Sequence, residues 1–162
     1  MKLLRTVVIL ALFLCAAALT GCGRSQNANV NAPANTALDN TNSAKTNIEE
    51  LGMWVNVPYE AEDIVWKETA DRKQIIAVLR FSGEDANKIV ADAAPRQAPQ
   101  SVILSSESWF PAELIAQSEM SGDDTLNGLA YAADSFYQEP YTAGRIVRID
   151  GTDYFVLELS AK

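Results

Sequence analysis

The chain contains no histidine, and its only two cysteines, Cys15 and Cys22, both lie within the first 22 residues. The absence of histidine excludes Ser-His-Asp and Cys-His catalysis and removes the commonest protein ligand of transition metals. The phosphate-binding and nucleophile motifs G-x-x-x-x-G-K-[ST], G-x-G-x-x-G and G-x-S-x-G are also absent. Beyond residue 22 no thiol remains for a disulfide, a metal site or a nucleophile. We therefore expect a folded region without catalytic residues, metal or cofactor.

The first 18 residues have the pattern of an export signal. Lys2 and Arg5 give the N-terminus two positive charges, and residues 7–18 then form an uncharged apolar run of twelve. A helix that crosses a bilayer needs about 20 apolar residues, whereas a run of roughly 7–15 behind a basic start is typical of a secretory signal peptide. We therefore interpret the run as the hydrophobic region of a signal and not as a membrane span.

The residues that follow this run are Leu19-Thr20-Gly21-Cys22: an aliphatic residue, a small residue, a glycine and a cysteine. This tetrapeptide resembles the lipobox of bacterial lipoprotein precursors. The resemblance implies that a signal peptidase cuts between Gly21 and Cys22, so that the signal peptide, residues 1–21, is removed. It also implies that the Cys22 sulfur carries a diacylglyceryl anchor with acyl chains such as palmitate. The alternatives are an N-terminal transmembrane anchor and an ordinary signal peptide that happens to contain a cysteine.

A lipid anchor of this kind determines where the protein resides, because two or more acyl chains hold a protein stably on its membrane. In Gram-negative lipoproteins an aspartate directly after the modified cysteine favours retention in the inner membrane, and this chain has Gly23 at that position. The resemblance thus implies a cell-envelope protein at the outer membrane, facing the periplasm. The outer face of the cytoplasmic membrane is the alternative.

Residues 22–49 are predicted to be a disordered tether behind the lipidated Cys22. The stretch Gly23–Asn47 is rich in Asn, Ala, Thr and Ser and contains no aromatic residue, so it buries too little apolar surface to offset its ordering entropy. Residues 50–162 then form one globular domain. Without the signal peptide the chain has 11 basic and 21 acidic residues, a net charge of −10. This charge argues against a nucleic-acid partner.

The domain is predicted to be α+β: a mostly antiparallel sheet of about five or six strands with two helices. Asp150-Gly151 separates two apolar runs and predicts a hairpin, with Ile146 and Leu157 on one face and Val147 and Val156 on the other. Because both faces are apolar, we expect this hairpin to be central and covered by a helix on one side. The other expected elements are strands at 63–68, 74–81, 101–104 and 126–134 and helices at 82–95 and 108–117.

Carboxylates are the remaining candidates for chemistry, and they gather at two places: Glu60, Glu62 and Asp63 in one, Asp123 and Asp124 with Asn127 in the other. Glycoside hydrolysis needs two carboxylates about 5–10 Å apart, and the first group is the candidate for such a pair. The second group only loosely resembles a calcium loop, because its spacing does not match that of EF-hand ligands. At both places a solvated loop is the simpler interpretation.

Aromatic residues indicate a partner-facing loop. Phe136, Tyr137 and Tyr141 lie close together in the segment 135–144, and exposed aromatic side chains mark recognition surfaces, core packing being the alternative. We expect a membrane-anchored envelope lipoprotein with a non-catalytic binding or structural domain. Its partners are then the membrane, through the anchor, and an envelope protein or glycan. The alternative is a histidine-free, carboxylate-based hydrolase of cell-wall or glycan substrates.

Overall fold

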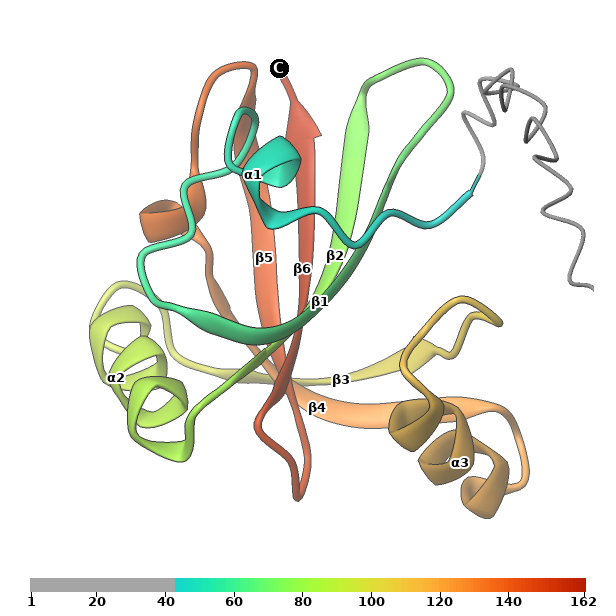
Figure 1. Cartoon of the computed structure of the whole chain (residues 1–162). Coiled ribbons are helices and arrows are strands. Elements are labelled where there is room, and N and C mark those ends of the chain that lie inside the picture. The colour runs from blue at the N-terminus through green and yellow to red at the C-terminus, as the bar shows by residue number, and fades with distance from the viewer. Residues whose placement is uncertain (1–42) are drawn as a thin grey trace, which may run out of the picture. The chain divides into compact units, whose positions relative to one another are not determined.

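The computed structural model describes residues 43–162, which contain one six-stranded sheet with helices on both faces (Figure 1). All neighbouring strands are antiparallel, in the order β1-β2-β6-β5-β4-β3. The elements are α1 (Ile48–Leu51), β1 (Ala61–Glu68), β2 (Gln74–Phe81), α2 (Gly83–Ala93), β3 (Gln100–Ser105), α3 (Ala112–Ser121), β4 (Thr125–Ala132), the 3-10 turn η1 (Asp134–Phe136), β5 (Tyr141–Ile149) and β6 (Tyr154–Ala161). The predicted α+β class is confirmed.

The hairpin of β5 and β6 lies at the centre of the sheet, between β4 and β2. Ile146 is opposite Leu157 and Val147 is opposite Val156, so each pair shares the face that was predicted for it. Four residues, 150–153, connect the two strands, and not the two residues Asp150-Gly151 alone. All four side chains are buried. Helices cover both faces of the hairpin, so the expectation of a helix on one side only was incomplete.

The sheet carries one hydrophobic core on each face. On the first, called the α2 face here, Trp66, Leu79 and Phe155 pack with residues of α1, α2 and η1. On the second, the α3 face, Val78 and Val156 pack with residues of α3 and of the segment that precedes it. Because β2 and β6 are buried on both faces, each contains a continuous apolar run, 75–79 and 154–157.

α2 begins directly after its capping residue Ser82, at the predicted position, whereas α3 begins at Ala112, four residues after the predicted start at 108, and also ends later than predicted. The Ser82 hydroxyl oxygen accepts a hydrogen bond of 3.1 Å from the Asp85 backbone N–H, which caps α2. Pro111 is the N-cap of α3, and the helix continues to Ser121, four residues beyond the predicted end at 117. It stops at Gly122, whose φ of 83° is a left-handed conformation that glycine adopts readily.

The folded unit begins earlier than residue 50. Lys45 and Trp66 exchange two backbone hydrogen bonds of 2.8 Å, so Lys45 pairs with the outer edge of β1. Asn47 caps α1 by accepting a hydrogen bond of 3.1 Å from the Glu50 backbone N–H, and its carbonyl accepts one of 3.2 Å from the buried Trp66 indole. The prediction that the tether extends to residue 49 is therefore wrong, because these polar residues pair with β1 and Trp66. The rest of the predicted tether lies outside the described residues.

Candidate binding surface

The predicted lipidation site Cys22 and the cleavage position after Gly21 lie outside the described residues, as does the signal segment before them. Within residues 43–162, no helix has the length and the apolar character that crossing a membrane requires. The domain itself offers three kinds of candidate site: the carboxylate groups, the aromatic loop and the edges of the sheet.

The first carboxylate group is divided among different surroundings. Glu62 forms an ion pair with Arg80, with an N···O distance of 3.5 Å. Asp63 accepts a hydrogen bond of 3.4 Å from the Tyr154 hydroxyl. Glu60 lines a cavity of about 560 Å³ beside α1. Three neighbours in sequence thus have separate partners in the fold.

The second carboxylate group is a hydrogen-bonded turn between α3 and β4. The Asp123 carboxylate accepts hydrogen bonds of 2.6 Å from the Thr125 hydroxyl and 2.7 Å from the Ser121 hydroxyl. Asp124 has a left-handed backbone with φ of 55°, and Asn127 lies within β4. Across the part of the chain that the structure describes, no three Asp or Glu side chains come together as a metal site.

The described carboxyl groups whose pKa is clearly shifted all have a lowered pKa, whereas a general acid needs a raised one. The pKa values of Asp71, Asp85 and Asp123 all lie below the ordinary value. The largest cause in each case is a hydrogen bond from a neighbouring side chain: Thr69 for Asp71, Lys88 for Asp85 and Thr125 for Asp123. A carboxylic acid that donates a proton near neutral pH needs a raised pKa. These three carboxyls therefore do not support the hydrolase alternative.

The aromatic loop is packed into the α2 face. Phe136 and Tyr141 are only 2% and 1% exposed, so the prediction that they face a partner is wrong. The Tyr141 hydroxyl donates a hydrogen bond of 2.6 Å to the Glu68 carboxylate on β1, and burial together with this bond raises the Tyr141 pKa. Tyr137 is half-buried, and its hydroxyl donates a hydrogen bond of 3.0 Å to the Gly144 carbonyl. The three aromatic side chains thus help to close the core where β5 begins.

The two edge strands of the sheet differ in how they are protected. β1 has four charged residues, a bulge between Ala61 and Asp63, and the backbone pairing with Lys45. Charges, bulges and covering segments are the features by which proteins prevent an edge from pairing with another chain. β3 contains no charge and no proline, and it pairs with β4 without a bulge. Within residues 43–162 nothing pairs with its outer edge, so β3 is an unprotected edge strand.

The backbone groups that β3 presents at this edge follow from the register. The Ser106 N–H donates a hydrogen bond of 2.8 Å to the Asp124 carbonyl, and bonded pairs alternate with unbonded pairs along an antiparallel ladder. Asn127, opposite Ile103, uses its carbonyl instead for the Asp150 N–H, at 3.0 Å. Three residues of β3 therefore direct their N–H and C=O groups outward: Ser101, Ile103 and Ser105.

An apolar patch continues from this edge onto the α2 face. The Ile103 side chain is 69% exposed, and Leu129 on the adjacent strand is 37% exposed. Ser101 is opposite Leu129, so Ile103 and Leu129 are diagonal neighbours within reach of each other. We call the outward backbone groups of Ser101, Ile103 and Ser105, together with the Ile103 and Leu129 side chains, the β3 edge surface.

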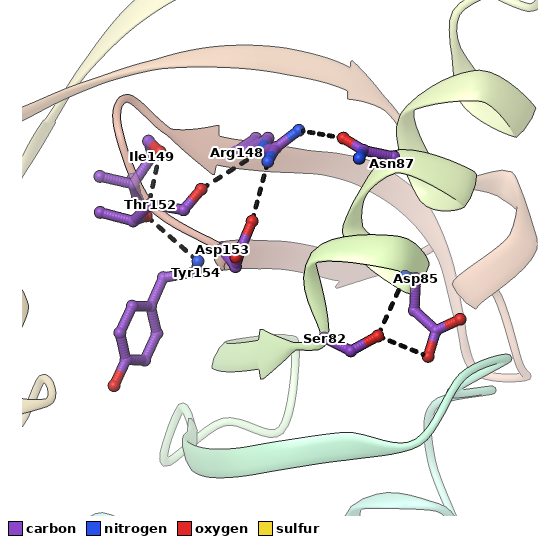
Figure 2. A network of polar contacts seen from close by, with 8 residues as sticks. All are labelled: Ser82, Asp85, Asn87, Arg148, Ile149, Thr152, Asp153 and Tyr154. Carbon is purple, nitrogen blue, oxygen red and sulfur yellow. Dashed lines mark hydrogen bonds and ion pairs between the residues drawn. The ribbon is translucent and has the colours of Figure 1, made fainter.

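A polar network borders the β3 edge surface on β5, where Arg148 is opposite Leu129. Its guanidinium donates hydrogen bonds of 2.9 Å to Asp153, 3.1 Å to Asn87 on α2 and 3.3 Å to the Thr152 carbonyl (Figure 2). Arg148 therefore connects the β5–β6 turn to α2, and its positive charge is paired with the Asp153 carboxylate. The network fixes the strands behind the β3 edge surface and is not an anion site.

Ile103 and Leu129 are not among the site residues that the sequence predicted. The available signal was the uncharged stretch between Arg96 and Glu107, ten residues in a chain in which 21% of residues are charged. Its meaning depends on β3 being an edge strand, which the fold establishes. Compared with protein-family models, with curated proteins and with solved structures, the chain matches none.

Proposed function

We propose that this chain is a lipid-anchored envelope protein whose domain acts by binding another strand and not by catalysis. The observation that carries the proposal is an unprotected strand edge on a domain that follows a lipobox, Leu19–Cys22. The lipobox supports export and anchoring. The β3 edge surface supports binding by strand addition, in which backbone hydrogen bonds give affinity and side chains give specificity.

The arrangement of the domain is compatible with binding while the chain is anchored. The described chain enters the domain beside the outer edge of β1, where Lys45 pairs with Trp66, and β3 is the opposite edge of the sheet. Six strands at a spacing of about 4.8 Å separate the two edges by about 24 Å. The segment at Lys45 thus occupies the edge of β1 and leaves the edge of β3 uncovered.

The anchor is tested by metabolic labelling with a fatty-acid probe in an envelope-bearing bacterial host. We expect label on the unaltered chain and on Cys15→Ala, because Cys15 belongs to the discarded signal. The Cys22→Ala chain should carry no label and should retain residues 1–21, since cleavage follows lipidation in this class. Label that persists on Cys22→Ala would refute the anchoring proposal.

Binding at the β3 edge is tested with a photoreactive amino acid in the full chain. Placed at Ile103, it should give adducts in intact cells, because this side chain lies on the proposed surface. Met120 is the matched control, since its side chain is 82% exposed but belongs to α3 and not to β3. Equal yields at the two positions would contradict a binding role for β3.

A further inference from the structure

We propose that the strand bound at the β3 edge surface is β3 of a second copy of this chain, paired antiparallel about a two-fold axis through Ile103. The proposal names the partner of the surface described under Proposed function and rests on that function. It does not require the lipid anchor, so the labelling experiment and the experiment below can fail independently.

The first argument is that β3 is chemically symmetric about Ile103. Residues 101–105 read Ser-Val-Ile-Leu-Ser, a polar residue at each end of three apolar residues. A two-fold axis at the centre places Ile103 opposite the partner's Ile103, Val102 opposite the partner's Leu104, and Ser101 opposite the partner's Ser105. Opposite residues in an antiparallel pair lie on the same face, so apolar side chains meet apolar ones on both faces.

The second argument is that this register uses every outward backbone group of β3. Ser101, Ile103 and Ser105 all become members of hydrogen-bonded pairs, which gives six backbone hydrogen bonds between the two strands. Moving the axis to Val102 or Leu104 retains only four bonds among these residues. The hydrogen-bonding pattern and the side-chain symmetry therefore select the same register.

The third argument concerns charge and exposed apolar area. Residues 97–106 carry no charge, so two chains of net negative charge meet along a neutral segment. The remaining repulsion acts between charges farther away and is screened by salt. On the α2 face the pairing brings together the two exposed Ile103 side chains, each beside its own Leu129. The patch that is exposed in one copy is thereby covered by the same patch of the other.

The experiment is cysteine cross-linking of the full chain in native membranes with a short bis-maleimide. Opposite Cα atoms in a hydrogen-bonded antiparallel pair are about 5.5 Å apart, so Ile103→Cys should give a dimer of twice the chain mass. We expect about tenfold more dimer than with Met120→Cys, which is more exposed, at 82% against 69%, but should react only on random collision. The chain without a new cysteine measures the background, which should be low because the proposed lipid blocks the Cys22 sulfur.

The register is tested with Ser101→Cys and Ser105→Cys. Ser101 lies about 13 Å from the partner's Ser101, because four strand residues separate this position from the opposing one. Neither variant alone should therefore cross-link efficiently, whereas the two variants expressed together should. Ser105→Pro in the Ile103→Cys chain removes an outward N–H without removing a bond to β4, and it should lower the dimer yield about tenfold.

Three results would overturn the proposal. Equal dimer yields from Ile103→Cys and Met120→Cys would show that β3 does not pair with β3. Efficient cross-linking of Ser101→Cys alone would show a parallel or shifted arrangement. An adduct of Ile103→Cys with a protein of different mass would show that another strand occupies the edge, which contradicts a second copy but leaves binding at β3 in place.

Discussion

Gly144 provides a quantitative test of how β5 and β6 pack at the centre of the sheet. Its φ is 140°, a conformation that residues with a side chain rarely adopt, and it lies beside the bulge between Tyr141 and Ala143. A Cβ at this position would clash with the Glu158 carbonyl oxygen and lie 2.9 Å from the Leu159 Cα. Both atoms belong to the backbone of β6, so the Gly144→Ala chain must shift one central strand against the other.

The expected loss of stability follows from these two terms. A residue forced into an unfavourable φ costs about 1–3 kcal/mol, and overpacking of a close contact adds about 1–3 kcal/mol. We therefore expect Gly144→Ala to lower the free energy of unfolding by about 3 kcal/mol or more. Gly122→Ala is the matched control: its φ is also positive, at 83°, but a Cβ there meets no atom within 4 Å. Its cost is the conformational term alone, about 1–2 kcal/mol.

Urea unfolding of the purified chain, followed by tryptophan fluorescence, measures both values, because one of the three tryptophans, Trp66, is fully buried in the folded state. Domains of this size have m-values of about 1–3 kcal/mol/M, so the midpoint for Gly144→Ala should fall by about 1–3 M. If Gly144→Ala lowered the free energy of unfolding no more than Gly122→Ala does, the close contact between β5 and β6 at Gly144 would be refuted.

Three further substitutions test local features of the domain. Phe136→Ala should destabilise the domain by about 3–5 kcal/mol in urea unfolding, because the ring is buried in the core; an unchanged midpoint would mean that the ring is exposed. Ser82→Ala should cost about 1 kcal/mol through loss of the α2 cap, and no change would argue against the bond to Asp85. Tyr141→Phe should cost about 1–2 kcal/mol because the Glu68 carboxylate loses its donor. The raised Tyr141 pKa means that the unfolded chain loses this proton first, so stability should fall as pH rises above about 10, and less steeply in Tyr141→Phe. Equal slopes in urea titrations between pH 8 and 11 would contradict that assignment.

The central hairpin is the part of the fold that local sequence determines most completely. Asp150-Gly151 indicates where the chain reverses, and the period of two on each side places Ile146 and Leu157 on one face without tertiary information. The register could not be predicted in this way, because a two-residue turn would put Ile146 opposite Phe155, whereas four residues, 150–153, connect the strands. The α2 cap at Ser82 is similarly local. The end of α3 was also available in the sequence, because Gly122 is a typical helix-terminating residue, but the apolar pattern alone stopped the prediction at 117.

Burial of the aromatic loop depends on contacts between distant parts of the chain. Tyr141 is buried because its hydroxyl reaches Glu68, 73 residues earlier, and no local pattern reports that contact. α1 has only four residues, too few for a helical period, and its place depends on Trp66 accepting Lys45 as a partner. The β3 edge surface could not be predicted from the sequence for the same reason: Ile103 becomes an exposed edge residue only once the strand order places β3 last.

The central claim, a lipid anchor on Cys22, is tested most directly by mass spectrometry of the N-terminal peptide of the mature chain. Trypsin cuts after Arg24, so the claim predicts a peptide that begins at Cys22, with the sequence Cys-Gly-Arg and the added mass of a diacylglyceryl group. An unmodified Cys22, or a mature chain that still carries residues 1–21, would contradict it.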